Sequence, residues 1–284
     1  MDIIEKITLE LNSMSATKKR IAKEILQNPM QVAFSSAKML ADKLGISPAS
    51  IVRFAQQITG GRGYPQLQQE IQAHVRAITD PIKKLEQNVI LSTPYEQLLA
   101  QIYETQLINI KKTFNQELIK AVNDVTTMVS TAERIYTCGS RGAYATAYYL
   151  GHMLNRVFSN ADTLTDDAKL VDYLVRVTKK DIVIFVCFPR YSARLLSAAK
   201  TLKKVGVKII TIDSSAKTPF AQYSDVLLTT FNHSNDFHNS QVSAMLVSEM
   251  IVSHVISNNL ERSLDNLSRM EPAFSNLCQF IDEE

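Results

Sequence analysis

The sequence lacks the features that would place a chain in a membrane or outside the cell. It has no run of about 18 apolar residues, the length that a membrane-spanning helix needs. Its first residues do not follow the pattern of a secretory signal peptide. Only 3 of the 284 residues are cysteine, an odd number with no metal-ligand spacing. These absences predict a cytoplasmic protein with reduced thiols, no bound metal and no cofactor.

The chain also has little net charge, and its excess positive charge is unevenly distributed. The net charge of the whole chain is +3. Residues 1–80 contain 10 Lys and Arg against 7 Asp and Glu, whereas residues 81–284 contain 21 of each. The excess positive charge therefore lies in the N-terminal part, which favours a polyanionic partner there.

Residues 39–58 form the most informative segment, and their pattern predicts two short helices joined by a tight turn. Gly45 suits the left-handed position that ends a helix, Ser47 can cap the next helix, and Pro48 fits its first position. Apolar residues recur along the second helix at helical spacing. They are Ile51, Phe54, Ala55 and Ile58.

The opposite face of this second helix offers small and hydrogen-bonding side chains, which suit a recognition helix in a major groove. An ordinary helical hairpin is the alternative. Arg62 follows in a glycine-rich turn, where it can contact a phosphate. The predicted DNA-contacting residues are Ser47, Ala49, Ser50, Arg53, Gln56, Gln57 and Arg62. The basic triplet at 18–20 is interpreted as a solvated face.

The sequence divides into a helical part and a mixed part. Helices are expected at 3–12, 16–27 and 64–77, besides the hairpin. Asp80-Pro81 breaks the pattern, and a long helical segment is expected from Tyr95 to Thr131. We predict a helix-turn-helix domain at 1–77, a linker at 78–93 and a second domain at 94–284.

From Glu133 onward, strands alternate with helices. The segment from Asp181 to Cys187 is a continuous apolar run, typical of a strand buried on both faces. Further strands are expected at 134–138, 207–212, 226–230 and, with a weaker pattern, 161–164; helices are expected at 143–158, 191–205 and 240–258. This alternation predicts an α/β domain with a parallel sheet flanked by helices, its core at about 133–258.

Three loops follow strands of the predicted sheet, and ligands of such sheets bind at the carboxyl ends of the strands. These loops lie at 139–142, 188–192 and 213–218, and the first two precede helices, whose N-termini attract anions. The alternative is that the serines cap helices and the arginines reach solvent or a partner subunit. The side chains expected to bind a small phosphorylated ligand are Ser140, Arg141, Arg190, Tyr191, Ser192, Asp213 and Ser214.

Other chemistry has weaker support in the sequence. The loop at 139–142 lacks the G-x-G-x-x-G pattern, so NAD is not expected. His233, Asp236 and His238 could suggest a metal site, but a solvated loop is the preferred interpretation. No Ser/His/Asp or Cys/His set can be assembled, and Cys187 is expected to be a core residue.

Together these motifs resemble those of the RpiR-type transcriptional regulators, over nearly the whole chain. This family joins a helix-turn-helix domain to a SIS (sugar isomerase) domain and acts as phosphosugar-responsive repressors or activators. The N-terminal part of the resemblance rests on Asn28-Pro29, Leu40-Ala41 and residues 45–54 and 60–64. The C-terminal part rests on the strand–Gly139-Ser-Arg–helix unit, residues 181–184, the loop before Tyr191, and Asp225.

One segment departs from the family pattern. SIS domains often carry a Ser-x-Ser-Gly-x-Thr loop around the sugar phosphate, whereas residues 187–192 here read Cys-Phe-Pro-Arg-Tyr-Ser. A phosphate would then be bound through Arg190 rather than through hydroxyl and backbone groups. The identity of the sugar is therefore open.

The leading interpretation is a transcriptional regulator, not an enzyme, in which a phosphorylated effector shifts the spacing of paired helix-turn-helix domains. We expect a homodimer or homotetramer on a palindromic double-stranded operator. One alternative is a sugar-phosphate isomerase with an accessory helical domain, although only His238 and Glu249 could supply its base. Another is a DNA-binding protein whose second half serves only for assembly.

Overall fold

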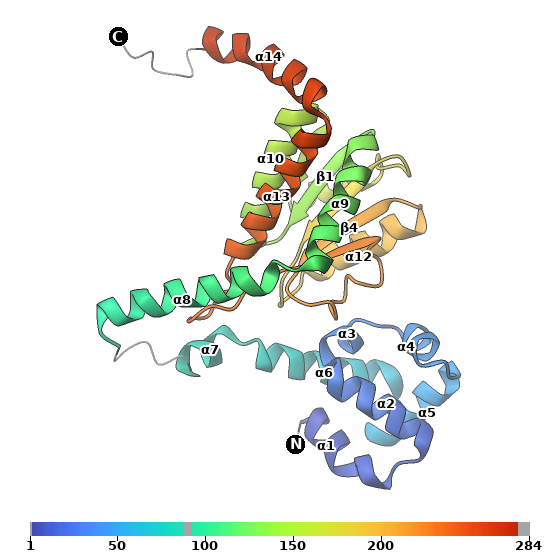
Figure 1. The fold of residues 1–284 in the computed structure, drawn as a ribbon. Coiled ribbons are helices and arrows are strands. Elements are labelled where there is room, and N and C mark those ends of the chain that lie inside the picture. Colours follow the sequence, from blue (N-terminus) through green and yellow to red (C-terminus); the bar gives the residue numbers. More distant parts are fainter. Residues whose placement is uncertain (1, 88–92, 278–284) are drawn as a thin grey trace. The chain divides into compact units, whose positions relative to one another are not determined.

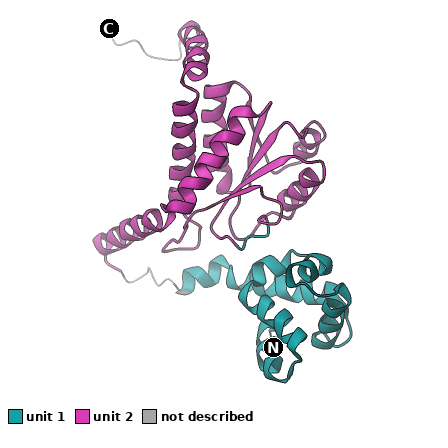
Figure 2. Ribbon diagram, turned by 45° about the vertical axis from the view of Figure 1, so that its right-hand side comes forward, with its two compact units in different colours: residues 1–92, 217–219 teal, residues 93–216, 220–284 magenta. Residues whose placement is uncertain are grey.

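The computed structural model describes residues 2–87 and 93–277, and it divides the chain into two compact units. Unit 1 comprises residues 1–92 with 217–219, and unit 2 comprises 93–216 with 220–284 (Figure 2). Residues 88–92 of the predicted linker and the end of the chain, which includes Cys278, lie outside the described residues. Within the described part, each helix is too short or too polar to cross a membrane.

Unit 1 is helical (Figure 1). Its helices are α1 (Ile3–Glu10), α2 (Ala16–Gln27), α3 (Pro29–Ala33), α4 (Ala37–Leu44), α5 (Pro48–Ile58), α6 (Gly63–Ile78) and α7 (Pro81–Gln87), with a 3-10 turn at Leu11–Ser13. Two of them were not predicted. Pro29 and Pro81 each begin a new helix, because proline at the first helical position needs no N–H partner.

The core of unit 1 is built from apolar side chains of helices α1 to α6. The four apolar residues predicted on α5 are fully buried in it, which confirms the amphipathic pattern. Burying one large aliphatic or aromatic side chain contributes about 1.5–3 kcal/mol. The opposite face of α5 makes no contribution to this core, so its residues are available for another role.

Unit 2 contains a five-stranded parallel sheet in the order β2-β1-β3-β4-β5. Its strands are β1 (Ile135–Gly139), β2 (Ala161–Leu164), β3 (Ile182–Val186), β4 (Lys208–Asp213) and β5 (Val226–Thr229). All five predicted strands are present. Because β2 lies on one side of β1 and β3 on the other, the strand order reverses between β1 and β3. A crevice forms at such a reversal.

Helices cover both faces of this sheet. The helices of unit 2 are α8 (Tyr95–Thr113), α9 (Gln116–Thr131), α10 (Ala143–Phe158), α11 (Lys169–Leu174), α12 (Ala193–Lys204), α13 (Val242–Asn258) and α14 (Leu260–Asn276). Of these, α8 packs against α13, and α14 packs mainly against α10. Figure 1 shows α9, α10 and α13 on one face, where Ile184 and Val186 join their apolar cluster. Val183 and Phe185 alternate with them and point to the face where α12 packs on β4.

The helical segment predicted from Tyr95 to Thr131 is present, but it consists of two helices, α8 and α9. Phe114 is extended, and Asn115 caps α9 by accepting a hydrogen bond from Leu118 N at 2.9 Å. An asparagine at this position satisfies a backbone N–H that the helix leaves unpaired. The short helix α11 was not predicted either.

Gly151 sets the distance between α10 and the strands beneath it. A Cβ at this position would lie 2.3 Å from both Thr137 Oγ1 and Thr163 Oγ1, which hydrogen-bond to each other at 2.9 Å. We therefore expect Gly151→Ala to destabilise the protein by about 1–3 kcal/mol through overpacking. Thermal unfolding of the two proteins measures this difference.

Gly142→Ala is the matched control for that substitution. Gly142 has a helical φ of −59°, and the nearest atom to an added Cβ is Gln241 Nε2 at 4.0 Å. Its effect on unfolding is expected to stay within about 0.5 kcal/mol. Equal melting temperatures for wild type and Gly151→Ala would show that α10 can move away from the sheet at no cost.

Candidate functional site

The turn between α4 and α5 has the geometry that its sequence predicts. Gly45 is left-handed at φ 59°, and Ile46 N donates to Ala41 O at 3.1 Å. Ser47 Oγ accepts from Ser50 N at 3.3 Å and caps α5, in which Pro48 is the first residue. These local hydrogen bonds determine the direction of α5 relative to α4.

The predicted DNA-contacting residues of α5 share one face of the unit. Ala49, Arg53, Gln56 and Gln57 are exposed on α5, together with Ser47 at its cap, and Ser50 is half-buried. Arg53 Nη2 donates to Ser50 Oγ at 3.4 Å, and Ser50 Oγ lies 2.9 Å from Ser47 Oγ. The face thus presents small groups around one arginine.

Arg62 lies in the turn that follows α5. Gly60, Gly61 and Gly63 all have positive φ values, which is the conformation that glycine adopts most readily. Arg62 is exposed, and its Nε donates to Thr59 O at 3.2 Å. Its guanidinium group is therefore held near the C-terminus of α5.

The interpretation of residues 18–20 as a solvated face was incomplete. Lys18 Nζ donates to Gln57 Oε1, and Arg20 Nη2 donates to Leu44 O at the end of α4. Two cations of α2 therefore contact the hairpin itself. The sequence contained one indication that Lys18 faces the rest of the unit. Lys18 lies at helical spacing (i, i+3, i+4, i+7) from Ile21, Ala22 and Ile25, which are the buried apolar residues of α2.

In unit 2, the structure places the three predicted ligand loops at the same edge of the sheet. Gly139 pairs with Val186 and Val186 with Ile212, so β1, β3 and β4 end at nearly the same level. The loops after β1 and β3 flank the reversal in strand order. A Cβ on Gly139 would lie 2.6 Å from Ala143 O, so the first loop can turn this tightly only with glycine.

Two arginines in these loops have unusual backbone conformations. Arg141 has φ 55° and Arg190 has φ 71°, in the left-handed region that costs a residue with a Cβ about 1–2 kcal/mol. Both side chains are exposed. Strained residues of this kind concentrate at binding sites, where the surrounding structure holds them in place.

The other predicted ligand residues have structural partners. Ser192 Oγ accepts from Leu195 N at 3.3 Å and caps α12, a bond that leaves the hydroxyl hydrogen of Ser192 available as a donor. Tyr191 Oη donates to Asp213 Oδ1 at 3.0 Å, and Ser214 N donates to the same oxygen at 2.6 Å. Asp213 is fully buried, so this carboxylate ties the loop after β3 to the end of β4. Ser140 is half-buried at the start of the first loop.

Cys138 and Cys187 lie near this edge but do not suit nucleophilic chemistry. Both are free thiols and both are buried. Burial raises the pKa of Cys138 to about 12 and raises the pKa of Cys187 well above its ordinary value. Both thiols are therefore protonated at neutral pH, and Cys187 is a core residue as expected.

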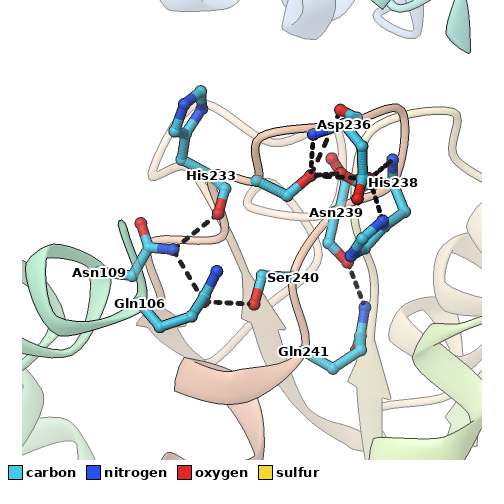
Figure 3. A network of polar contacts seen from close by, with 9 residues as sticks. Gln106, Asn109, His233, Asp236, His238, Asn239, Ser240 and Gln241 are labelled. Carbon is cyan, nitrogen blue, oxygen red and sulfur yellow. Dashed lines mark hydrogen bonds and ion pairs between the residues drawn. The ribbon is translucent and has the colours of Figure 1, made fainter. Parts of the chain in front are cut away.

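A fourth segment, residues 231–241, follows β5 and contacts one of these loops, which the sequence did not predict. Figure 3 shows its polar network. Asn109 Nδ2 donates to His233 O at 2.7 Å, and Ser240 Oγ donates to Gln106 Oε1 at 2.6 Å. Asn239 Nδ2 donates to Pro189 O at 3.4 Å. The segment therefore links α8 to the loop that contains Arg190, whereas its polar composition had suggested a solvated loop.

The same segment reaches the start of α10. Thr146 Oγ1 donates to Gln241 Oε1 at 3.0 Å, which places the N-terminus of α13 beside that of α10. His238 is paired with Asp236. Over residues 2–87 and 93–277, no group of three or more His, Cys, Asp or Glu side chains could hold a metal ion.

A helix-turn-helix unit joined to a SIS-type α/β unit defines a class of transcriptional regulators. The family model described as "Helix-turn-helix domain, rpiR family" matches residues 1–77, and the SIS domain model matches residues 128–255. The chain belongs to the RpiR-type transcriptional regulators, as the resemblance in its sequence implied.

Relatives of known sequence or structure agree with this assignment. An uncharacterized HTH-type transcriptional regulator of Thermotoga maritima is 22% identical over 281 residues, covering 98% of this chain and 99% of that one. The sugar isomerase domain of an RpiR transcription factor from Sphaerobacter thermophilus has a TM-score of 0.59 at 23% identity, covering 62% of this chain and 99% of that chain.

A second solved structure resembles almost the whole chain. It is the Vibrio vulnificus NanR protein in complex with ManNAc-6P, with a TM-score of 0.61 at 16% identity, covering 97% of this chain and 99% of that chain. At these identities, the two solved structures show that the fold is shared.

Proposed function

We propose that this regulator binds an operator in double-stranded DNA through α5, and that a small phosphorylated metabolite at the carboxyl edge of the sheet controls this binding. The observation that carries the DNA-binding part is the division of α5 into two faces. Its apolar face is fully buried, whereas Ala49, Arg53, Gln56 and Gln57 are exposed on the other. A recognition helix needs such a face to reach base edges in a major groove.

The class of effector is inferred from the two strained arginines. Arg141 and Arg190 follow β1 and β3, which are neighbouring strands, and two guanidinium groups there suit a phosphate. The start of α10 adds a helix N-terminus, which favours an anion. The phosphosugar in the NanR complex supports a sugar phosphate as the effector of this chain as well.

The phosphate would be held differently from that in the common SIS loop. Where that loop supplies hydroxyl and backbone donors, this chain has Phe188, Pro189 and Arg190, and the O–H of the capping residue Ser192 is the hydroxyl donor that remains at its end. The buried carboxylate of Asp213 repels an anion close to it, so the arginine side chains have to outweigh this repulsion. We propose Ser140, Arg141, Arg190, Ser192 and Ser214 as direct contacts, with Tyr191 and Asp213 shaping the loop.

In the proposed mechanism, the effector controls DNA binding through an assembly of several chains. We propose that residues 1–77 form the DNA-binding domain and that residues 78–93 link it to the second domain. Residues 94–284 would then bind the effector and assemble into a homodimer or homotetramer. Paired α5 helices would then match a palindromic operator. The effector can change the affinity for DNA only by as much as its own affinity differs between the two states.

An isomerase function has less support from these residues. Isomerisation of a sugar needs a base beside the reacting carbons. The loops at 139–142, 188–192 and 213–218 contain no His or Glu, and Asp213 is bound to Tyr191. His238 is paired with Asp236, and Glu249 is exposed on α13.

Selection from a randomised duplex library with the full chain tests this proposal. We expect an enriched sequence with two-fold symmetry, whose affinity falls as salt rises. A panel of hexose phosphates that includes N-acetylmannosamine 6-phosphate should then contain a compound that changes this affinity. At 100 times its Kd, that compound should stabilise the protein by about 2.7 kcal/mol in a thermal-shift assay.

The experiment tests DNA binding and effector binding independently, so each part of the proposal can be refuted without the other. A library without enrichment would refute DNA recognition by α5. If a DNA sequence is enriched but no compound of the panel stabilises the protein, the proposal of DNA binding is retained and the proposal of a sugar-phosphate effector is rejected.

A further inference from the structure

The side chain of Gln57 on α5 is not free to present both of its polar atoms. Lys18 of α2 donates a hydrogen bond from Nζ to Gln57 Oε1. Lys18 is half-buried and lies one turn before Ile21 and Ala22, which pack in the core that α2 and α5 share. The packing of α2 on α5 therefore directs the lysine stem toward Gln57.

The chemistry of lysine decides which atom of the amide it holds. An ammonium group has three donors and no acceptor, so the amide atom facing it is the oxygen. The bond orients the amide and occupies one lone pair of Oε1 with a cation. The second lone pair of Oε1 lies beside the same ammonium group, so the Nε2 amine, which has donors only, is the less hindered group for a neighbouring molecule.

This orientation has a consequence for base recognition. Glutamine reads adenine with both amide atoms, since Oε1 accepts from the adenine N6 amine while Nε2 donates to N7. With Oε1 held by Lys18, the bidentate pair is hindered and a donor-only group faces the groove. Acceptors such as guanine O6 and N7 or thymine O4 then match it better.

We propose that Lys18 is a specificity-determining residue, which acts through Gln57 by turning this side chain into a donor-only reader of DNA. The inference rests on the proposed binding of DNA by α5. It concerns a residue outside the hairpin, and it predicts a change in base preference rather than only a loss of affinity.

The experiment compares four full-length proteins on the same randomised duplex library. They are wild type, Lys18→Met, Gln57→Ala and the double variant, where methionine keeps most of the lysine stem but cannot donate. Gln57→Ala identifies the base pair that Gln57 reads. At that pair, Lys18→Met is expected to raise the preference for adenine over the wild-type base by at least about fivefold.

Two controls separate positioning from charge. Lys23→Met removes the same charge from an exposed position of α2 and should leave the base profile unchanged. In the Gln57→Ala background, Lys18→Met should no longer alter the profile, because its effect passes through the glutamine. Thermal unfolding verifies that all variants are folded.

Three results would overturn the inference. The base profile of Lys18→Met could equal that of wild type, or Gln57→Ala could leave every position unchanged. Lys18→Met could also weaken binding to all sequences alike and reduce the salt slope by about 0.9, the mark of a lost phosphate contact. A wild-type protein that enriches no sequence refutes the proposed DNA binding instead, and the library shows this before any variant is compared.

Discussion

Replacing Arg53 by alanine is expected to weaken binding to the selected operator by about 1–3 kcal/mol, the value of one good contact to a base. Arg53 is the only cation on the exposed face of α5, and it lies midway along the helix. Its bond to Ser50 Oγ is long, at 3.4 Å, so the guanidinium group can leave it for a base or a phosphate. Titration of labelled operator at several salt concentrations measures the effect.

The substitution is not expected to unfold the helix. Alanine has the highest helix propensity, and the residues that anchor α5 are the buried apolar ones on its other face. A loss of affinity at unchanged thermal stability therefore reports a contact with DNA. The salt slope then tells whether that contact is to a phosphate or to a base.

Arg76→Ala is the matched control, because Arg76 is an exposed arginine of the same unit on the last turn of α6. This variant carries the same change in charge but lies off the α5 face. If Arg53→Ala and Arg76→Ala both bind the operator as tightly as wild type, Arg53 does not contact the DNA.

The features that could be predicted from the sequence are those that neighbouring residues determine. The turn at Gly45 and the cap at Ser47 depend on bonds within a few residues, and both have the expected geometry. The strands of unit 2 could be predicted because buried parallel strands are continuous apolar runs. Even the weak pattern of β2 lies where it was expected.

The features that were missed depend on residues far apart in the chain. Lys18 contacts Gln57 across 39 positions, and Asn109 contacts His233 across 124. An exposed lysine and a lysine that holds an amide look alike in a sequence. The polar segment 231–241 likewise resembles a solvated loop until its partners on α8 are known.

Local strain at the ligand loops was also invisible in the sequence. Glycine would have marked a left-handed residue, but Arg141 and Arg190 occupy that region instead. Their side chains were predicted as phosphate contacts from the motif positions alone. The positive φ values add an independent reason for proposing a role for both residues.

The second large effect is expected for Arg190→Ala, which should weaken binding of the stabilising sugar phosphate at least about tenfold, or 1.4 kcal/mol. Arg190 replaces the serine and glycine donors of the common SIS loop, so few other groups of its loop can bind a phosphate. Ser192, which caps α12 through its oxygen, offers one O–H donor, and Tyr191 already donates to Asp213. Calorimetric titration of wild type and variant with that compound measures the ratio of the Kd values.

Alanine at position 190 isolates the contribution of the guanidinium group. Like arginine, alanine has a Cβ, so the cost of φ 71° stays nearly the same in the variant. Arg176→Ala serves as the control, since Arg176 is exposed in the segment that leads into β3, away from the carboxyl ends of the strands. Equal Kd values for wild type and Arg190→Ala would place the phosphate elsewhere. A loss confined to Arg190→Ala, with DNA binding in the absence of effector unchanged, would place it at the loop after β3.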